Sequence, residues 1–152
     1  MDQSLEDLYG SLQTPQSILE SLLCGVKVLS NGWASASCPF HEDKNPSFSI
    51  HLSSGNWKCF SCQKTGPFFE LPGNSGEPVP SVIYAYTKEH ETKYIKARYF
   101  PKTFRIFSVV DGDVISGRNG GEDLLYNWDH VKNKQGDVYI VEGEKDVDNL
   151  TK

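Results

Sequence analysis

The spacing of hydrophobic residues predicts helices at the start of this chain. Residues 4–12 have the pattern of one or two helical turns. Beyond them, four apolar residues recur on one helical face, after a threonine–proline pair and before a glycine. Such a pair begins helices, and glycine ends them. The residues of this second predicted helix are Thr14, Pro15, Ile18, Leu19, Leu22, Leu23 and Gly25.

Between residues 26 and 59 the pattern changes to that of short strands separated by turns. Residues 30–32 read Ser-Asn-Gly, a turn signal, and residues 53–56 read Ser-Ser-Gly-Asn, which we expect to close a hairpin. Runs rich in strand-forming residues flank both turns. The expected strands cover residues 26–29, 33–37, 47–52 and 57–59.

A segment rich in proline and glycine then divides the chain. Residues 71–80 contain three prolines and two glycines, which argue against a regular element. We therefore predict one domain over residues 1–72, a linker over residues 73–80 and a second domain over residues 81–152.

The second domain begins as a series of strands and ends as an α/β unit. Asp129 is a candidate cap for a short helix that continues to Asn133. Val138–Val141 is a continuous apolar run, which is typical of a strand buried on both faces of a parallel sheet. An acidic turn follows, and a helix is expected from Lys145. The earlier strands are expected over residues 81–86, 94–100, 104–110 and 113–116.

Three cysteines and one histidine form two matched pairs within the first domain. Cys38 and His41 are separated by two residues, as are Cys59 and Cys62, and seventeen residues lie between the pairs. Each pair lets a tight turn direct two donors toward one ion, so the spacing predicts a zinc site. Three thiolates and one imidazole fill a tetrahedron, so a single zinc ion there would be structural and not catalytic.

The alternative interpretation is that these cysteines are reduced side chains that only pack in a core. It leaves the matched spacing of the two pairs unexplained. The short strands around these ligands bury little apolar surface, and structural zinc supplies on the order of 10–16 kcal/mol. We therefore expect folding of this segment to depend on the bound ion. The fourth cysteine, Cys24, lies outside the pattern and is expected to be a buried, small apolar residue.

Composition and charge narrow the classes of function. The 152 residues are 38% hydrophobic and 23% charged, as in globular proteins. No apolar run reaches membrane-span length and no secretory signal precedes the first helix, so we expect a cytoplasmic protein with no membrane partner. Four cysteines fit a reducing compartment better than a disulfide scaffold. The net charge of −5 comes from acidic ends around a mildly basic middle, which argues against tight, indiscriminate duplex binding.

The residues around the metal pairs resemble the zinc-binding domain of bacterial-type DNA primases. The family pattern is C-P-F-H-x-E-K-T-P-S-F, followed by C-F-x-C and a glycine. This chain reads C-P-F-H-E-D-K-N-P-S-F and then C-F-S-C-Q-K-T-G. Asp43 and Asn45 replace the usual Glu and Thr, and Pro67 stands where many members carry an acid. The ligands are unaffected, and the resemblance covers about a third of the chain.

A second resemblance lies near the C-terminal end. Residues 138–146 read V-Y-I-V-E-G-E-K-D and are similar to the opening strand and glutamate of a TOPRIM domain, the catalytic core of these primases. Alone this motif is weak, but it follows a primase-type zinc ribbon in the family's order. The stretch from Tyr84 to Tyr126 is most similar to primases of phages, plasmids and other mobile elements.

The resemblance implies an enzyme that joins ribonucleotides on a single-stranded DNA template. Its substrates would be nucleoside triphosphates, and a replicative helicase would be a partner protein. In the family the TOPRIM glutamate, here Glu142, and a later Asp-x-Asp pair bind Mg²⁺ or Mn²⁺. Asp146 and Asp148 have that spacing but lie on the first predicted helix, which makes them poor substitutes. We therefore expect these 152 residues to contain the front of a primase without its active centre.

Two sets of residues are predicted to contact the template. Single-stranded DNA is bound by aromatic stacking and by cations along the backbone. The alternatives are solvated lysines on a hairpin and an exposed alternating strand face. The ribbon set is Lys44, Lys58, Phe60 and Lys64, and the set before the TOPRIM motif is Arg98, Lys102 and Arg105.

The sequence thus predicts an α+β fold: a zinc ribbon with an N-terminal helix, followed by a mixed α/β segment that enters a truncated TOPRIM domain. Three functions compete. The first is the template-recognising part of a primase, and the second is a non-catalytic module that binds DNA or protein and carries a vestigial TOPRIM start. The third, a TOPRIM nuclease or recombination protein with a zinc site, is disfavoured by the cysteine–histidine spacing.

Overall fold

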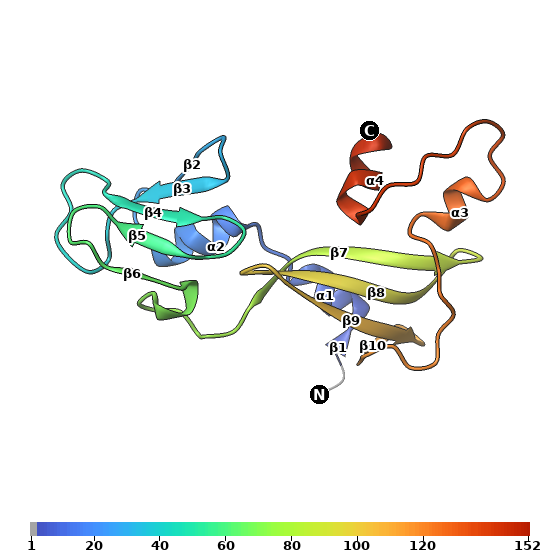
Figure 1. Cartoon of the computed structure of the whole chain (residues 1–152). Coiled ribbons are helices and arrows are strands. Elements are labelled where there is room, and N and C mark those ends of the chain that lie inside the picture. Colours follow the sequence, from blue (N-terminus) through green and yellow to red (C-terminus); the bar gives the residue numbers. More distant parts are fainter. Residues whose placement is uncertain (1–2) are drawn as a thin grey trace. The chain divides into compact units, whose positions relative to one another are not determined.

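The computed structural model describes residues 3–152 and has the expected α+β fold, built mainly from two five-stranded sheets (Figure 1). The chain divides into two compact units that each combine distant segments. The ribbon unit consists of Ser11–Ser81 and Arg98–Thr103. The sheet unit consists of residues 3–10 together with Val82–Ala97 and Phe104–Lys152.

The ribbon unit begins with helix α2 (Pro15–Leu22), as predicted. Thr14 caps this helix, because its side-chain oxygen accepts a hydrogen bond from the backbone N–H of Ser17 at 3.1 Å. Ile18 and Leu19 are buried on the inner face of the helix. The helix ends at Leu22, and Cys24 beyond it is exposed, so the prediction that Cys24 is buried is wrong.

An antiparallel sheet forms the body of the ribbon unit, in the order β2-β3-β4-β5-β6. Every neighbouring pair is antiparallel, and the two predicted turns join β2 to β3 and β4 to β5. The 3-10 helix η1 (Phe68–Glu70) follows the last strand. The strands are β2 (Lys27–Val28), β3 (Trp33–Ala36), β4 (Phe48–His51), β5 (Trp57–Cys59) and the unpredicted β6 (Thr65–Gly66).

The core of the ribbon unit is an aromatic stack beneath the sheet. Trp57 is buried, and its ring lies 5.0 Å from that of Phe40 and 5.3 Å from that of Phe48. Its indole N–H donates a hydrogen bond to the carbonyl of Pro67 at 2.8 Å, so the polar end of the ring is satisfied. Phe48 is therefore part of the buried core, and Phe40, which is half-buried, packs against it.

The ribbon core also includes residues from a hairpin that follows the predicted linker. Phe100 is 1% exposed and packs edge-to-face against Phe68, with ring centroids 4.8 Å apart. The backbone N–H of Lys102 donates to the carbonyl of Ser53 at 2.8 Å. Gly55 has φ +72°, and a Cβ there would lie 2.8 Å from Pro101, so this contact requires glycine.

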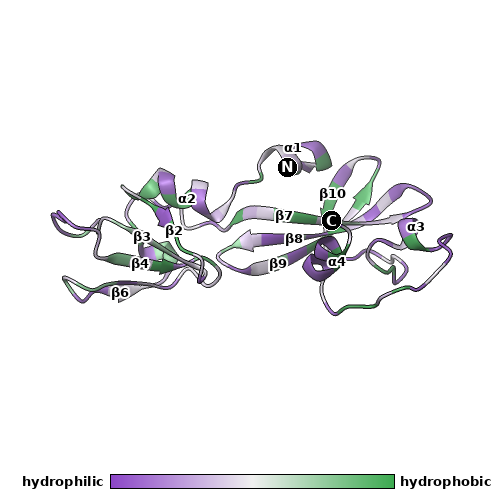
Figure 2. Ribbon diagram, turned by 90° about the horizontal axis from the view of Figure 1, so that it is seen from above, coloured by the Kyte–Doolittle hydropathy of each residue, from purple (hydrophilic) through white to green (hydrophobic). Residues whose placement is uncertain are grey.

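The second sheet belongs largely to the sheet unit and has the order β1-β10-β9-β8-β7. Leu8 of helix α1 (Leu5–Gly10) packs with Ile95 and Val114 as the buried centre of this unit. In Figure 2, β10 carries the green of hydrophobic residues, whereas green and purple alternate along much of the chain. The strands are β1 (Gln3–Ser4), β7 (Val79–Lys88), β8 (Glu91–Phe100), β9 (Thr103–Val110) and β10 (Asp113–Ser116).

The predicted domain ranges differ in detail from these compact units. Strand β7 begins at Val79, inside the predicted linker of residues 73–80. Residues 3–10 group with the sheet unit, although residues 1–72 were expected to form one domain. Residues 1–2 of that range lie outside the described residues. Whether the predicted ranges act as separate folding domains stays a prediction.

Asp129 does not cap a helix in the way its position suggested. Helix α3 (Trp128–Val131) begins after Asn127, whose φ is 65°, and Asp129 lies within its first turn. The Asp129 side chain is 3% exposed and accepts hydrogen bonds from the backbone N–H groups of Glu89 and His90, at 3.2 and 2.9 Å. The tight β7–β8 turn leaves these two donors unpaired, and the carboxylate satisfies them.

The predicted strand over Val138–Val141 is not formed. These residues have no regular structure, and Val138, Tyr139 and Ile140 are 56%, 79% and 89% exposed. A strand buried on both faces needs neighbours on both sides, and no strand among residues 3–152 pairs with this segment. Helix α4 (Glu144–Leu150) forms close to its predicted start.

Polar contacts fasten helix α4 to the sheet unit. The side chains of Tyr86 and Lys96 both donate to a carboxylate oxygen of Glu144, at 2.6 and 2.8 Å. Tyr126 donates to Asp148 at 2.9 Å. Within the described part of the chain, no helix is long and apolar enough to cross a membrane.

Candidate metal centre

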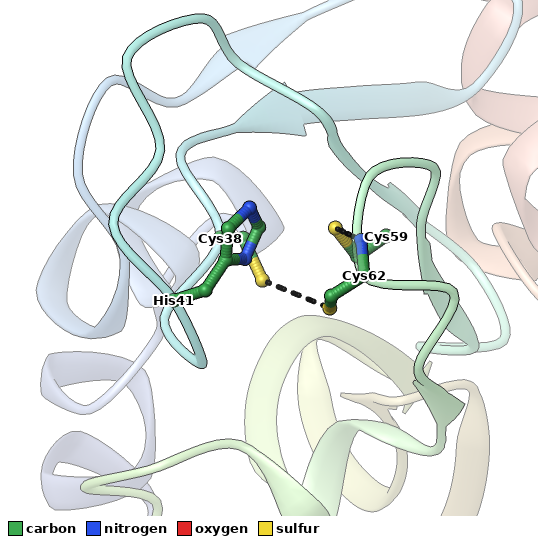
Figure 3. A group of neighbouring side chains, drawn as sticks. All are labelled: Cys38, His41, Cys59 and Cys62. Atoms are coloured by element: carbon green, nitrogen blue, oxygen red, sulfur yellow. Dashed lines mark hydrogen bonds between the residues drawn. The ribbon is translucent and has the colours of Figure 1, made fainter.

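The four predicted ligands meet at one end of the ribbon sheet (Figure 3). Cys38 follows strand β3 and His41 lies in the next loop, while Cys59 ends strand β5 and Cys62 lies in the turn after it. One donor atom from each residue lies within 4.8 Å of every other. Among residues 3–152, this is the only group of three or more such ligands close enough to hold a metal ion.

The sulfur positions suit a tetrahedral zinc ion. Cys38 Sγ and Cys62 Sγ are 4.0 Å apart. With zinc–sulfur bonds of about 2.3 Å at tetrahedral angles, two thiolates should lie about 3.8 Å apart. Cys38 and Cys59 are buried, and Cys62 is half-buried, so a bound ion would be largely shielded from water.

His41 presents the donor that the fourth position needs. Its Nδ1 atom is buried and has no hydrogen-bond partner among the described residues. An unpaired buried nitrogen is costly unless a ligand satisfies it. The other ring nitrogen, Nε2, lies 3.9 Å from Oδ1 of Asp43. The site therefore fits a structural zinc ion bound through Nδ1.

The thiols have different environments before any metal binds. Burial raises the pKa of the Cys38 thiol to about 11. Burial also acts to raise the pKa of Cys59, but hydrogen bonds from Ser47 and from the backbone of Cys62 and Ser61 outweigh it and lower this pKa to about 6. The Cys59 thiol therefore loses its proton more readily than the Cys38 thiol, and both must be thiolates to bind zinc.

The ribbon residues predicted to bind DNA surround this centre. Phe60 is 63% exposed, and Lys58 Nζ lies 5.4 Å from the centroid of its ring. Lys64 Nζ lies 5.1 Å from the centroid of Phe40. Lys44 is exposed and lines an open hollow of about 430 Å³ beside the metal pairs, together with Asn45 and five other residues.

The second predicted set is divided between the two units. Arg98 and Lys102 belong to the ribbon unit and Arg105 to the sheet unit. Two of the three aromatic residues in this stretch, Tyr99 and Phe100, are unavailable for stacking because they are 6% and 1% exposed, whereas Phe104 beside Arg105 is 42% exposed. Whether Arg98, Lys102 and Arg105 contact DNA stays a prediction.

Glu142, the predicted catalytic residue, is exposed and lies between the unpaired segment and helix α4. It belongs to no cluster of three metal-binding side chains among residues 3–152. The role of Glu142 in binding Mg²⁺ or Mn²⁺ therefore stays a prediction.

Sequence reasoning missed an outward row of side chains that crosses all five strands of the ribbon sheet. Direct cross-strand partners share a face of a sheet. The outer face also carries Trp33 packed edge-on against His51, with ring centroids 4.9 Å apart. Alternation along β5 could have revealed part of this row, but the strand register could not be read from the sequence. The row consists of Lys27, Ser35, Ser49, Lys58 and Thr65.

Comparison with known proteins identifies the ribbon but not the remainder of the chain. Residues 10–75 match the CHC2 zinc finger, a zinc-ribbon family of the DnaG type. The curated relatives include the DNA primase of Mycoplasma genitalium, 49% identical over 43 residues, and that of Streptomyces coelicolor, 52% identical over 29 residues. The DNA primase of Deinococcus radiodurans is 44% identical over 32 residues.

These matches are short compared with the relatives themselves. They cover 28%, 19% and 21% of this chain, but only 7%, 4% and 6% of the three primases. No solved structure matches the chain significantly. Within these limits, the ligand geometry and the family match agree: residues 10–75 form a CHC2 zinc finger of the kind found in DnaG-type DNA primases.

Proposed function

We propose that the ribbon unit recognises single-stranded DNA as the template-binding part of a primase that makes RNA primers for replication. The zinc ion holds the two ligand-bearing turns together, and the outer face of the sheet contacts the strand. Exposed Phe60 beside Lys58 carries this proposal, because a free aromatic ring next to a cation suits a stacked base and its phosphate.

The charge of the sheet supports the same function. The strands of this sheet contain no Asp or Glu in any position, and the structure describes all of them. Their outer row carries lysines at two positions and hydroxyl groups at the other three. Hydroxyl and ammonium groups donate to phosphate oxygens without reading base sequence. The binding would therefore tolerate many template sequences.

Binding of a fluorescent single-stranded oligonucleotide to the zinc-loaded chain tests this function. Replacing Phe60 with Ala should weaken binding about 5- to 150-fold, which corresponds to about 1–3 kcal/mol for one stacked base. Replacing Lys58 with Ala should reduce the slope of log affinity against log salt by about 0.7, the value for one phosphate contact on a single strand.

Matched controls exclude general effects of these substitutions. Phe69 is 43% exposed on the 3-10 helix η1, and Phe69→Ala should leave affinity unchanged. Lys134 is exposed in the sheet unit and serves as the control for Lys58. Equal affinity of the Phe60→Ala variant and the unaltered chain would contradict the proposal, provided that both retain zinc.

In the complete enzyme, the segment from Val138 to Asp146 begins a TOPRIM-type catalytic domain and Glu142 is its metal-binding glutamate. The sequence V-E-G-E-K-D supports this role. Binding of Mg²⁺ or Mn²⁺ then requires carboxylates besides those that residues 3–152 bring to Glu142. The enzyme uses nucleoside triphosphates, works beside a helicase and belongs to a phage, plasmid or other mobile element.

One observation favours the alternative, a non-catalytic module that binds DNA or protein. The segment Val138–Val141 is unpaired and Glu142 is exposed, as expected of a vestigial TOPRIM start. The two functions share the ribbon and differ in Glu142. If the module is correct, Glu142→Gln leaves every activity of the natural protein unchanged, whereas a primase loses primer synthesis.

A further inference from the structure

The loop between the first ligand pair and strand β4 is organised by a single carboxylate. The side chain of Asp43 is 6% exposed. Its Oδ2 atom accepts hydrogen bonds from the backbone N–H of Cys38 at 2.9 Å, from the backbone N–H of Ser47 at 3.0 Å and from the Ser47 hydroxyl at 2.9 Å. One oxygen atom thus joins a ligand residue to the end of the loop.

The same side chain faces the imidazole ligand. Oδ1, which makes none of these three bonds, lies 3.9 Å from Nε2 of His41. The opposite ring nitrogen, Nδ1, is the buried atom without a partner. Histidine ligands commonly donate their second ring N–H to a carboxylate, which fixes the tautomer and the orientation of the ring.

The network also reaches the second ligand pair. The Ser47 hydroxyl, which contacts Asp43, lies 3.3 Å from Cys59 Sγ. Asp43 therefore touches the first pair directly and the second pair through one hydroxyl. The neighbouring acid, Glu42, is exposed and has none of these contacts among the interactions described for the loop.

We propose that Asp43 is the positioning residue of the zinc site. Its Oδ2 holds the backbone of Cys38 and Ser47 in place, and its Oδ1 keeps the proton of His41 on Nε2. The lone pair of Nδ1 is then directed at the metal. This inference concerns metal binding alone and does not rest on DNA recognition.

Zinc affinity of the full chain, measured by competition with a chromophoric chelator, tests the proposal. Asp43→Asn keeps the size of the side chain but replaces one acceptor oxygen with a donor, and affinity should fall about 10- to 100-fold. Asp43→Glu restores the carboxylate and should recover most of that loss. Glu42→Gln removes the same charge one position away and should bind zinc like the unaltered chain. Equal affinity of the Asp43→Asn and Glu42→Gln variants would overturn the proposal.

A second measurement does not depend on whether a variant folds. Nitrogen-15 NMR of the imidazole rings in the unaltered, zinc-loaded chain distinguishes the two tautomers. We expect His41 to show a metal-bound Nδ1 and a protonated Nε2. A spectrum with zinc on Nε2 and the proton on Nδ1 would refute the assignment of Asp43, even if Asp43→Asn also weakened binding.

Discussion

At the residue scale, His41 differs from the other metal ligands because one of its buried polar atoms has no partner in the described part of the chain. His41 Nδ1 is buried without a partner among the described residues, and two of the three cysteines are buried. A core built only for packing would not place an unpaired imidazole nitrogen beside three thiols, because each unsatisfied polar atom costs about 1–3 kcal/mol. The local stability of the ribbon therefore depends on metal.

Replacing one ligand should remove that stability. We expect Cys59→Ser to lose tightly bound zinc and to unfold the ribbon unit, since structural zinc contributes on the order of 10–16 kcal/mol to folding. Metal analysis after dialysis, combined with thermal unfolding, measures both effects. The control is Cys24→Ser, which alters an exposed cysteine outside the cluster and should change neither quantity. A Cys59→Ser chain that still held one zinc ion per molecule would show that the ligand set is wrong.

At the scale of elements, the tip of the β8–β9 hairpin belongs to a compact unit whose other residues come earlier in the sequence. Arg98–Thr103 groups with the ribbon unit, and Phe100 is among its most buried side chains. Arg98 and Lys102 in this segment were predicted to contact DNA. Tyr99 and Phe100 pack inward, so the exposed Lys102 has no stacking surface from either of these rings.

This packing predicts a large effect from a substitution far from the metal pairs in sequence. Phe100→Ala should destabilise the ribbon unit by about 3–5 kcal/mol, the usual cost of deleting a buried phenylalanine. Chemical denaturation in a Trp128→Phe background, monitored by the fluorescence of Trp57 and Trp33, reports on this unit. Phe104→Ala, four residues away at a side chain that is 42% exposed, should have little effect. Similar denaturation midpoints for the two variants would contradict the assignment of Phe100 to this core.

At the scale of the whole molecule, the sequence predicted what depends on local order and missed what depends on distant partners. The matched ligand pairs and the Thr14 cap are local patterns, and both were predicted. The apolar run at Val138–Val141 suggested a buried strand, but burial requires neighbouring strands that no local pattern supplies. The same reason explains why Asp129 was assigned to a helix end: the donors that it satisfies lie about forty residues earlier.

The catalytic part of the resemblance leads to a prediction for the polypeptide as a whole. On a single-stranded template with ribonucleotides and Mg²⁺ or Mn²⁺, these 152 residues alone should make no primer. The reason is that residues 3–152 bring no further metal-binding cluster to Glu142. Gel analysis of labelled products checks this, with an active primase added to a parallel reaction as the control. Primers that disappeared in a Glu142→Gln variant would contradict the expectation.

The packing of the β8–β9 hairpin tip in the core of the ribbon unit has a consequence for folding during translation. A nascent chain that has emerged only as far as the second ligand pair already contains all four ligands, yet it lacks both Phe68 and Phe100, whose rings pack together in the full chain. The ribosome must deliver some forty further residues before this core closes. Domains of growing chains generally fold from the N-terminus onward. We therefore expect a ribbon that binds metal at this stage to remain incompletely packed until residues 98–103 have been synthesised.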